Sequence, residues 1–267
     1  MALLQVHLMS KALNRQTMVV VILPQMSKNE LGKQKCQTLW LLHGMQGDAT
    51  DWLRFTSIER YAEKNHLMVV LPGVDNSFYA DTAYRVNYWS FLSIELWQII
   101  RAWFPCFSDR REDNFVAGLS MGAGGTMKYA VNHPERFCQA VCLSGGSITT
   151  EDMASTFFVP DGPIQELEPA LGSVERILRT SDDVYAMAQQ KINEKSPLPT
   201  IHFWSGKEDP ILWSTRKAHD ILQSMGWPTT YRETDGYQHE WAFWDMAIKD
   251  TIERILPLKK RNFESQR

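Results

Sequence analysis

Short apolar segments alternate with helical segments along most of this 267-residue chain, and this alternation restricts its fold more than any other feature. The apolar runs are 37–42, 67–71, 114–117 and 139–143, and the helical segments between them are 58–62, 90–104 and 121–131. Strands and helices in this order pair in parallel through right-handed crossovers. The pattern therefore predicts an α/β fold with a mostly parallel central sheet flanked by helices.

Both ends of the chain extend this pattern. Residues 4–8 alternate between apolar and polar and residues 17–23 are rich in β-branched side chains, so they predict an opening hairpin. The later elements are expected at 200–204, 216–225, 229–234 and 241–255. Between them, the proline- and glycine-containing stretch 147–198 interrupts the alternation. We expect a single domain over 1–267 with a small cap or lid insertion at 147–198.

One predicted helix has a clear apolar face. Its face comprises Leu92, Leu96, Ile99, Ile100 and Trp103, and Pro105 ends the helix. We expect all five side chains to face the core.

Charge and composition exclude several classes of protein. Lys and Arg total 28 against 31 Asp and Glu, so the net charge of −3 lacks the basic field that nucleic-acid binding needs. No apolar stretch is long enough to cross a membrane, and the first residues lack the pattern of a secretion signal. Four cysteines without metal or redox spacing indicate reduced thiols. A cytoplasmic protein without a nucleic-acid or membrane partner is expected.

Residues 118–122 have the pattern G-x-S-x-G, in which small residues allow a strand to turn sharply into a helix with a serine at the tip. A predicted strand precedes Ser120 and a helix rich in small residues follows it. The alternative is a glycine-rich turn with an ordinary serine. This context favours Ser120 as a nucleophile.

A nucleophilic serine needs a general base, and in this fold class the base follows the nucleophile and an acid in the chain. His239 lies in a loop between the last strand and the last helix, where loops at the carboxyl edge of a sheet carry function. His202 lies within a strand and His219 within a helix, so a structural role is expected for both. His239 is the predicted base.

The predicted acid that orients this base is Asp209, which follows the strand ending at Trp204. Glu208 and Asp235 are rivals, but Asp235 is only four residues from His239 and would need a tight turn. Backbone N–H groups must also stabilise the oxyanion of the reaction. The expected donors are the amides of Met121, after the serine, and Met45, in the turn that starts at His43-Gly44. Gly44 is the alternative to Met45.

Four motifs follow one another in the chain: His43-Gly44-x-x-Gly47, Gly118-x-Ser120-x-Gly122, Gly206-x-x-Asp209 and His239-Glu240-Trp241. In this order they resemble the esterase D family, and within it the bacterial tributyrin esterases. The resemblance spans residues 5–256, with Ala123 standing where many relatives have a further glycine. It implies an α/β-hydrolase fold and hydrolysis of short-chain acyl esters by a Ser120, Asp209, His239 triad. Feruloyl (cinnamoyl) and acetylxylan esterases of the same family are alternatives.

Aromatic residues are frequent near the predicted site. Trp213 and Trp241 are candidate substrate-binding residues together with Gly44, although the aromatic side chains could equally serve as core packing. A small-molecule ester is the expected partner, a homo-oligomer is compatible with exposed aromatics, and no metal or organic cofactor is expected. The alternative of another class is a binding protein that keeps the hydrolase fold without turnover.

Overall fold

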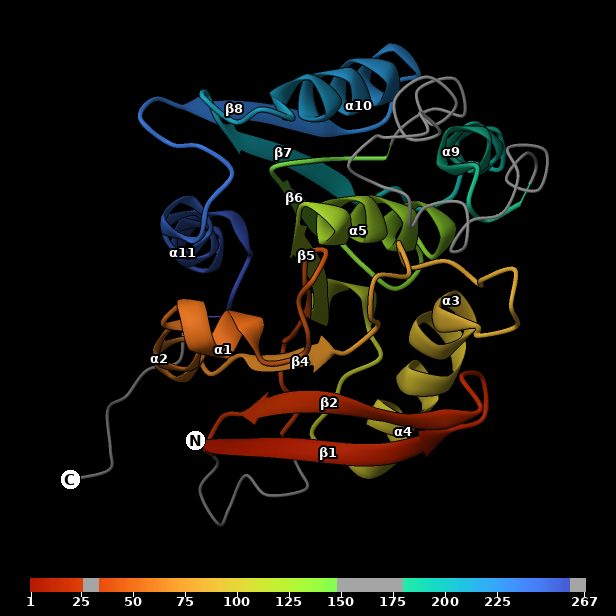
Figure 1. The fold of residues 1–267 in the computed structure, drawn as a ribbon, viewed down its shortest axis with the longest axis vertical. Coiled ribbons are helices and arrows are strands. Elements are labelled where there is room, and N and C mark those ends of the chain that lie inside the picture. The colour runs from red at the N-terminus through yellow and green to blue at the C-terminus, as the bar shows by residue number, and fades with distance from the viewer. Residues whose placement is uncertain (26–33, 148–179, 260–267) are drawn as a thin grey trace.

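The fold is described from a computed structural model, which describes residues 1–25, 34–147 and 180–259. These residues form an eight-stranded sheet in the order β1-β2-β4-β3-β5-β6-β7-β8 (Figure 1). The strands are β1 (Ala2–Ser10), β2 (Arg15–Leu23), β3 (Thr38–Leu42), β4 (Met68–Pro72), β5 (Asn114–Leu119), β6 (Gln139–Leu143), β7 (Thr200–Gly206) and β8 (Thr229–Thr234). Every strand expected from the sequence is present.

The expected hairpin and the expected parallel sheet are both confirmed. β1 pairs antiparallel with β2, and β2 pairs antiparallel with β4. The remaining neighbours, from β4 through β3 to β8, all pair in parallel. The carboxyl ends of the parallel strands therefore lie along one edge of the sheet, where residues distant in sequence come together.

Helices cover both faces of this sheet. The helices are α1 (Asp51–Phe55), α2 (Ile58–Lys64), α3 (Tyr88–Ser90), α4 (Trp97–Trp103), α5 (Met121–Asn132), α9 (Val184–Asn193), α10 (Leu212–Ser224) and α11 (Trp241–Asp250). Alternate residues of β3 belong to different cores: Trp40 packs in one and Leu39 in the other. The first core also contains side chains of α4, α5 and α10, and the second contains those of α1, α2 and α11 (Figure 1). The short helix α1 was not predicted.

The predicted helix between Ser90 and Pro105 forms, but one side chain on its predicted core face lies elsewhere. Leu92, Leu96 and Ile100 are buried as expected, whereas Trp103 is 54% exposed. The segment Phe91–Leu96 is π-helical, which places more residues in each turn than the α-helix assumed in the prediction. Trp103 keeps the helical spacing from buried Leu96 and Ile100, but residues 101–103 are all exposed, so the last turn of α4 lies beyond the core.

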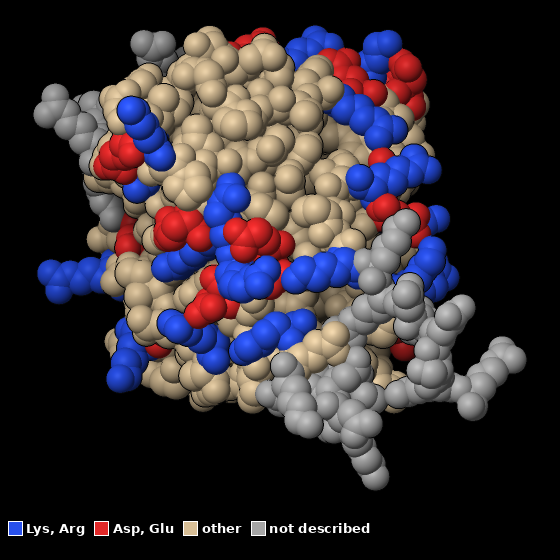
Figure 2. Space-filling view, turned by 180° about the vertical axis from the view of Figure 1, so that it is seen from behind, with Lys and Arg blue, Asp and Glu red and all other residues tan. Residues whose placement is uncertain are grey.

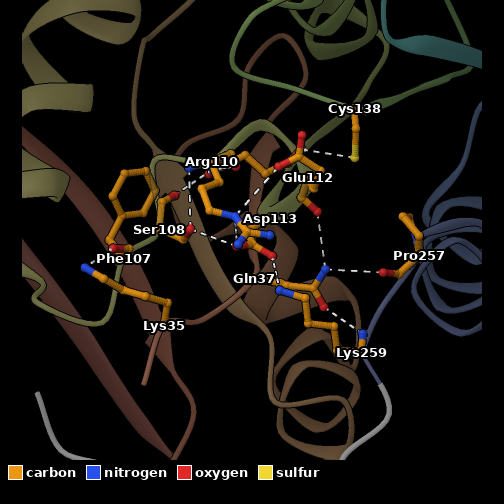
Figure 3. Close-up of polar contacts among 11 residues, drawn as sticks. Lys35, Gln37, Phe107, Ser108, Arg110, Glu112, Asp113, Cys138, Pro257 and Lys259 are labelled. Carbon is orange, nitrogen blue, oxygen red and sulfur yellow. Dashed lines mark hydrogen bonds and ion pairs between the residues drawn. The ribbon is translucent and has the colours of Figure 1, made fainter. Parts of the chain in front are cut away.

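Residues near the C-terminus are held against the amino ends of the strands. The side chain of Gln37 donates to the carbonyl oxygens of Glu112 (3.4 Å) and Pro257 (3.2 Å), and it accepts from the Lys259 amide at 2.8 Å. Lys259 also pairs with buried Asp113 at 2.5 Å. Figure 3 shows Gln37 between these partners. Since β3 and β5 begin beside this cluster, it lies at the edge opposite their carboxyl ends.

On the face seen in Figure 2, basic and acidic side chains lie beside one another in the same band. Charges of both signs are therefore mixed on this face. Within the described ranges, no helix is both long and apolar enough to span a membrane.

The predicted insertion falls mostly outside the described residues, which resume at residue 180. Its last part contains α9, which packs against α5 through buried Val184 and Ala188. The assignment of 147–198 as a cap or lid stays a prediction.

Candidate active site

Ser120 stands at a sharp turn between β5 and α5. Its φ is 53°, in the left-handed region that residues other than glycine seldom adopt. A Cβ added to Gly118 would lie 2.4 Å from the carbonyl oxygen of Gly122, and one added to Gly122 would lie 2.6 Å from that of His43. Both glycines are therefore required by space, and the predicted strand–serine–helix turn is confirmed.

The loops after β7 and β8 bring two side chains to this serine. The Nε2 atom of His239 lies 3.0 Å from the hydroxyl oxygen of Ser120, and its Nδ1 atom lies 3.0 Å from Oδ2 of Asp209. The Asp209 side chain is fully buried, whereas that of His239 is 26% exposed. The structure thus joins the three residues in one hydrogen-bonded chain that ends at an accessible serine.

Backbone contacts between the two loops fix this arrangement. The Lys207 amide donates to the carbonyl of Thr234 at 2.9 Å, which continues the pairing of β7 with β8. The Glu208 amide donates to the carbonyl of Tyr237 at 3.1 Å, and the Tyr237 amide donates to Oε2 of Glu208 at 3.0 Å. These reciprocal bonds hold the Asp209 loop beside the His239 loop.

The rival residues have other partners. Glu208 supports the loop through Tyr237, and Asp235 forms an ion pair with Lys207 at 2.7 Å. His202 lies between Thr230 and Gln139 within the sheet, at 2.7 Å from each side chain. His219 packs against Tyr231 with ring centroids 5.0 Å apart. None of these contacts joins them to Ser120.

The Asp209 carboxylate is stabilised in its charged form. Burial by itself raises the pKa of this carboxyl. Hydrogen bonding and the charge of His239, the Ile211 amide and the Ser144 hydroxyl outweigh burial and hold the pKa below its usual value. A carboxylate that stays ionised can accept a hydrogen bond from Nδ1–H of His239, which leaves Nε2 unprotonated and able to take a proton from Ser120.

The turn after β3 lies directly beside the serine. A Cβ added to Gly44 would lie 3.6 Å from Cβ of Ser120. The Gly44 carbonyl accepts from Nδ1 of His43 at 2.7 Å and from the Gly47 amide at 3.3 Å. The C=O and N–H of a trans peptide point in opposite directions. Anchoring the Gly44 carbonyl therefore directs the Met45 N–H away from the His43 ring.

His43 supports this turn as a neutral ring. Its Nε2 atom accepts from the Val74 amide at 3.1 Å, so the proton resides on Nδ1, which donates to the Gly44 carbonyl. Burial lowers the pKa of His43, which keeps the ring uncharged. The hydroxyl of Tyr79 donates to the His43 carbonyl at 2.8 Å.

The second expected donor, the Met121 amide, is the first N–H of α5. The first N–H groups of a helix have no acceptor within the helix, and the helix dipole favours negative charge there. The Ser120 amide itself donates to the Leu143 carbonyl at 2.9 Å. The structure therefore places the predicted Met121 donor next to Ser120 and commits the serine's own amide to the sheet.

The two candidate tryptophans differ in position. Trp241 stacks on the exposed ring of Phe55, with centroids 4.9 Å apart, and meets Trp244 edge-on at 5.1 Å. Trp244 in turn meets the His239 ring edge-on at 4.9 Å, so Trp241 is one aromatic ring away from the base. Trp213, in the first turn of α10, is 39% exposed. Substrate contact by Trp213, Trp241 and Gly44 stays a prediction.

Sequence reasoning missed several side chains around the site. Ser144 and Ser205 surround Asp209, and the Asn76 side chain accepts from the Gln46 amide at 2.6 Å in the turn beside Gly44. Ser144 directly follows β6, and a polar residue at the carboxyl end of a parallel strand is a usable signal. In the part of the chain that the structure describes, no group of three His, Cys, Asp or Glu side chains could hold a metal ion.

Comparison with known proteins agrees with this geometry. A model of the family described as "Putative esterase" matches residues 10–254. The chain belongs to this esterase family. It is a serine hydrolase that acts on carboxylic ester bonds, and it has the α/β-hydrolase fold predicted from the resemblance to the esterase D family.

Individual relatives match over nearly the whole chain. An acetyl esterase of Caldicellulosiruptor saccharolyticus is 26% identical, and the match covers 95% of this chain and 97% of that protein. The structure of the Staphylococcus aureus serine hydrolase FphF is 29% identical with a TM-score of 0.84, over 96% of this chain and 98% of that one. The S. aureus S-formylglutathione hydrolase FrmB is 30% identical with a TM-score of 0.82, with the same coverage.

Proposed function

We propose that this esterase hydrolyses short-chain acyl esters with Ser120 as nucleophile, His239 as general base and Asp209 as the group that orients the base. The observation that carries the proposal is the chain of two 3.0 Å contacts from Ser120 through His239 to Asp209. The acetyl esterase relative supports a small acyl group. The structures of a ferulic acid esterase and of a feruloyl esterase module are 20% and 14% identical, so they support the shared fold alone.

The reaction proceeds in two halves. Nε2 of His239 takes the Ser120 proton while the serine oxygen attacks the ester carbonyl, and the oxyanion that forms accepts hydrogen bonds from the Met45 and Met121 amides. The carbon–oxygen bond to the alcohol then breaks, and His239 returns its proton to the leaving alcohol. Water repeats the sequence on the acyl-serine, releasing the carboxylic acid and the free serine. Each donor is worth roughly 3 kcal/mol in comparable enzymes.

Hydrolysis of p-nitrophenyl acetate, butyrate and octanoate and of a feruloyl ester tests the proposal, with Ser120→Ala in parallel. We expect a preference for the short acyl groups and loss of activity on all four esters in the variant. A preference for the feruloyl ester, also lost in the variant, would keep the mechanism and change the substrate class. Full activity of Ser120→Ala would refute the assigned nucleophile.

We also infer a cytoplasmic location and a homo-oligomer. The four cysteines lack the spacing of a metal or redox site, which supports reduced thiols and a reducing compartment. Phe55 and Trp213 have exposed aromatic rings, and aromatic side chains are enriched in the interfaces of many oligomers. Light scattering at several protein concentrations tests the oligomer, and a constant monomer mass would refute it.

A further inference from the structure

Ser144 occupies an unusual position directly after β6. It is fully buried, and its φ of 52° lies in the left-handed region that favours glycine. Its amide donates to the Trp204 carbonyl at 2.9 Å, which continues the pairing of β6 with β7. The left-handed backbone conformation costs free energy of folding for any residue other than glycine, and a buried hydroxyl without a hydrogen-bond partner adds to that cost. Both costs suggest that the Ser144 hydroxyl has a function.

The hydroxyl of Ser144 has partners on two sides. Its oxygen accepts from Nε1 of Trp244 at 3.0 Å. The Ser144 hydroxyl also interacts with the Asp209 carboxylate and helps to lower its pKa. Because Trp244 donates to the Ser144 oxygen, it restricts the directions that the hydroxyl proton can take.

Trp244 contacts the base as well. Its ring meets that of His239 edge-on, with centroids 4.9 Å apart and planes at 89°. Trp244 is 6% exposed and belongs to α11, which begins two residues after His239. One buried side chain thus packs against the imidazole and restricts the hydroxyl that interacts with its carboxylate partner.

Three groups besides His239 therefore surround the Asp209 carboxylate. The Ile211 amide donates to Oδ1 at 2.9 Å, the Ser205 hydroxyl donates to Oδ2 at 3.3 Å, and the Ser144 hydroxyl interacts with the carboxylate from the end of β6. Of these groups, Ser144 is the one tied through Trp244 to the imidazole. A carboxylate held in this way cannot rotate away from Nδ1 of His239.

We infer that Ser144 and Trp244 are positioning residues for ester hydrolysis, acting together to hold the Asp209 carboxylate and the His239 ring in line with Ser120. This inference rests on the proposed roles of those three residues. It assigns no proton transfer to either side chain.

Two substitutions at one position separate the hydroxyl from the backbone conformation. Ser144→Gly removes the hydroxyl and relaxes the positive φ, whereas Ser144→Ala removes the hydroxyl and keeps the unfavourable φ. We expect kcat for p-nitrophenyl acetate to fall about 10-fold in both, with KM unchanged, because the site loses transition-state alignment and not substrate contacts. If Ser144 served only the backbone, Ser144→Gly would keep full kcat, which would overturn the inference.

Trp244→Phe tests the other half of the pair. It keeps an aromatic edge against His239 and removes only the Nε1 donor, so kcat is expected to fall several-fold with KM unchanged. Trp204→Phe is the matched control, because Trp204 is equally buried in the same core and its Nε1 donates to Thr234 instead. We expect kcat of this control to equal that of the unsubstituted protein.

The double variant Ser144→Gly with Trp244→Phe completes the cycle. Because Trp244 acts through Ser144, kcat of the double variant is expected to equal that of Ser144→Gly. If the fold-losses of the two single variants multiplied in the double variant, the coupling would be overturned. The rate at which a fluorophosphonate labels Ser120 should fall in the same proportion as kcat. If Ser120→Ala is inactive and Ser144→Gly is fully active, only this inference fails. If Ser120→Ala is active, the proposed function fails.

Discussion

The two nitrogens of His43 make different contacts, and two substitutions can remove them one at a time. Nδ1 donates to the Gly44 carbonyl at 2.7 Å, and Nε2 accepts from the Val74 amide at 3.1 Å. In His43→Asn, the side-chain NH2 stands near the former Nδ1 and can still donate to Gly44. In His43→Gln, the side-chain oxygen can reach the former Nε2 and still accept from Val74, but the Gly44 carbonyl loses its 2.7 Å donor and keeps only the 3.3 Å contact with the Gly47 amide.

The expected effects follow from what each variant leaves unpaired. Each substitution removes the His43 partner of one buried backbone group, which costs about 1–3 kcal/mol of unfolding free energy. Only His43→Gln weakens the anchor of the Gly44 carbonyl and with it that of the peptide that carries the Met45 N–H. Loss of a whole oxyanion donor costs roughly 100- to 1,000-fold in kcat, so a misdirected one should cost about 10- to 100-fold.

Urea unfolding and steady-state kinetics with p-nitrophenyl acetate separate the two effects. We expect similar losses of stability in both variants, a large loss of kcat in His43→Gln and a small one in His43→Asn. Equal kcat in two folded variants would refute the claim that the Gly44 carbonyl anchor orients the oxyanion donor. A shift confined to KM would also contradict it, since the donor acts on the transition state.

Three further predictions concern other parts of the chain. Gly122→Ala places a Cβ 2.6 Å from the His43 carbonyl, so we expect at least about 2 kcal/mol of destabilisation and a lower kcat, measured by urea unfolding and p-nitrophenyl acetate turnover. Gln37→Ala removes the contacts that hold Lys259 and should lower stability by about 1–2 kcal/mol with kcat unchanged, and an altered kcat would contradict its placement at the far edge. Burial lowers the pKa of His202 from 6.5 to about 4, so the unfolded chain binds a proton in this window that the folded chain does not, and stability falls as the pH drops through it. His202→Gln should remove at most about 3 kcal/mol of that loss, checked by urea unfolding above and below the window.

Much of the site could be predicted because it depends on chain order and strand ends. Ser120 directly follows β5, and Asp209 and His239 lie in the loops that follow β7 and β8 at the carboxyl edge of the sheet. Short apolar or β-branched runs reveal these strands in the sequence. The two glycines beside Ser120 are also visible, because the turn leaves no room for a side chain at either position. Local patterns thus specify which residues reach this edge.

The features that escaped prediction depend on contacts distant in sequence. Trp103 was misplaced because the last turn of α4 is exposed, and residue spacing alone does not reveal where along a helix the core ends. The proton position on His43 depends on Val74, which lies on another loop. The role of Ser144 depends on Trp244, a hundred residues later in the chain.

The sheet itself converts strand order into the geometry of the site. The amide of Ser120, after β5, donates to the last residue of β6, and the amide of Ser144, after β6, donates to Trp204 in β7. The amide of Lys207, after β7, donates to the last residue of β8. Each strand is thus joined to the next by the first residue beyond its end.

These three bonds place the nucleophile, the positioning serine and the acid loop at successive steps along one edge. The base follows from the loop after β8, where Tyr237 ties it back to Glu208. A substitution at the opposite edge can weaken the fold without moving these steps, because the intervening strands are fully paired and buried on both faces. A substitution at the carboxyl end of a strand is not separated from the catalytic residues by such strands. We therefore expect substitutions there that lower stability only slightly to lower kcat strongly.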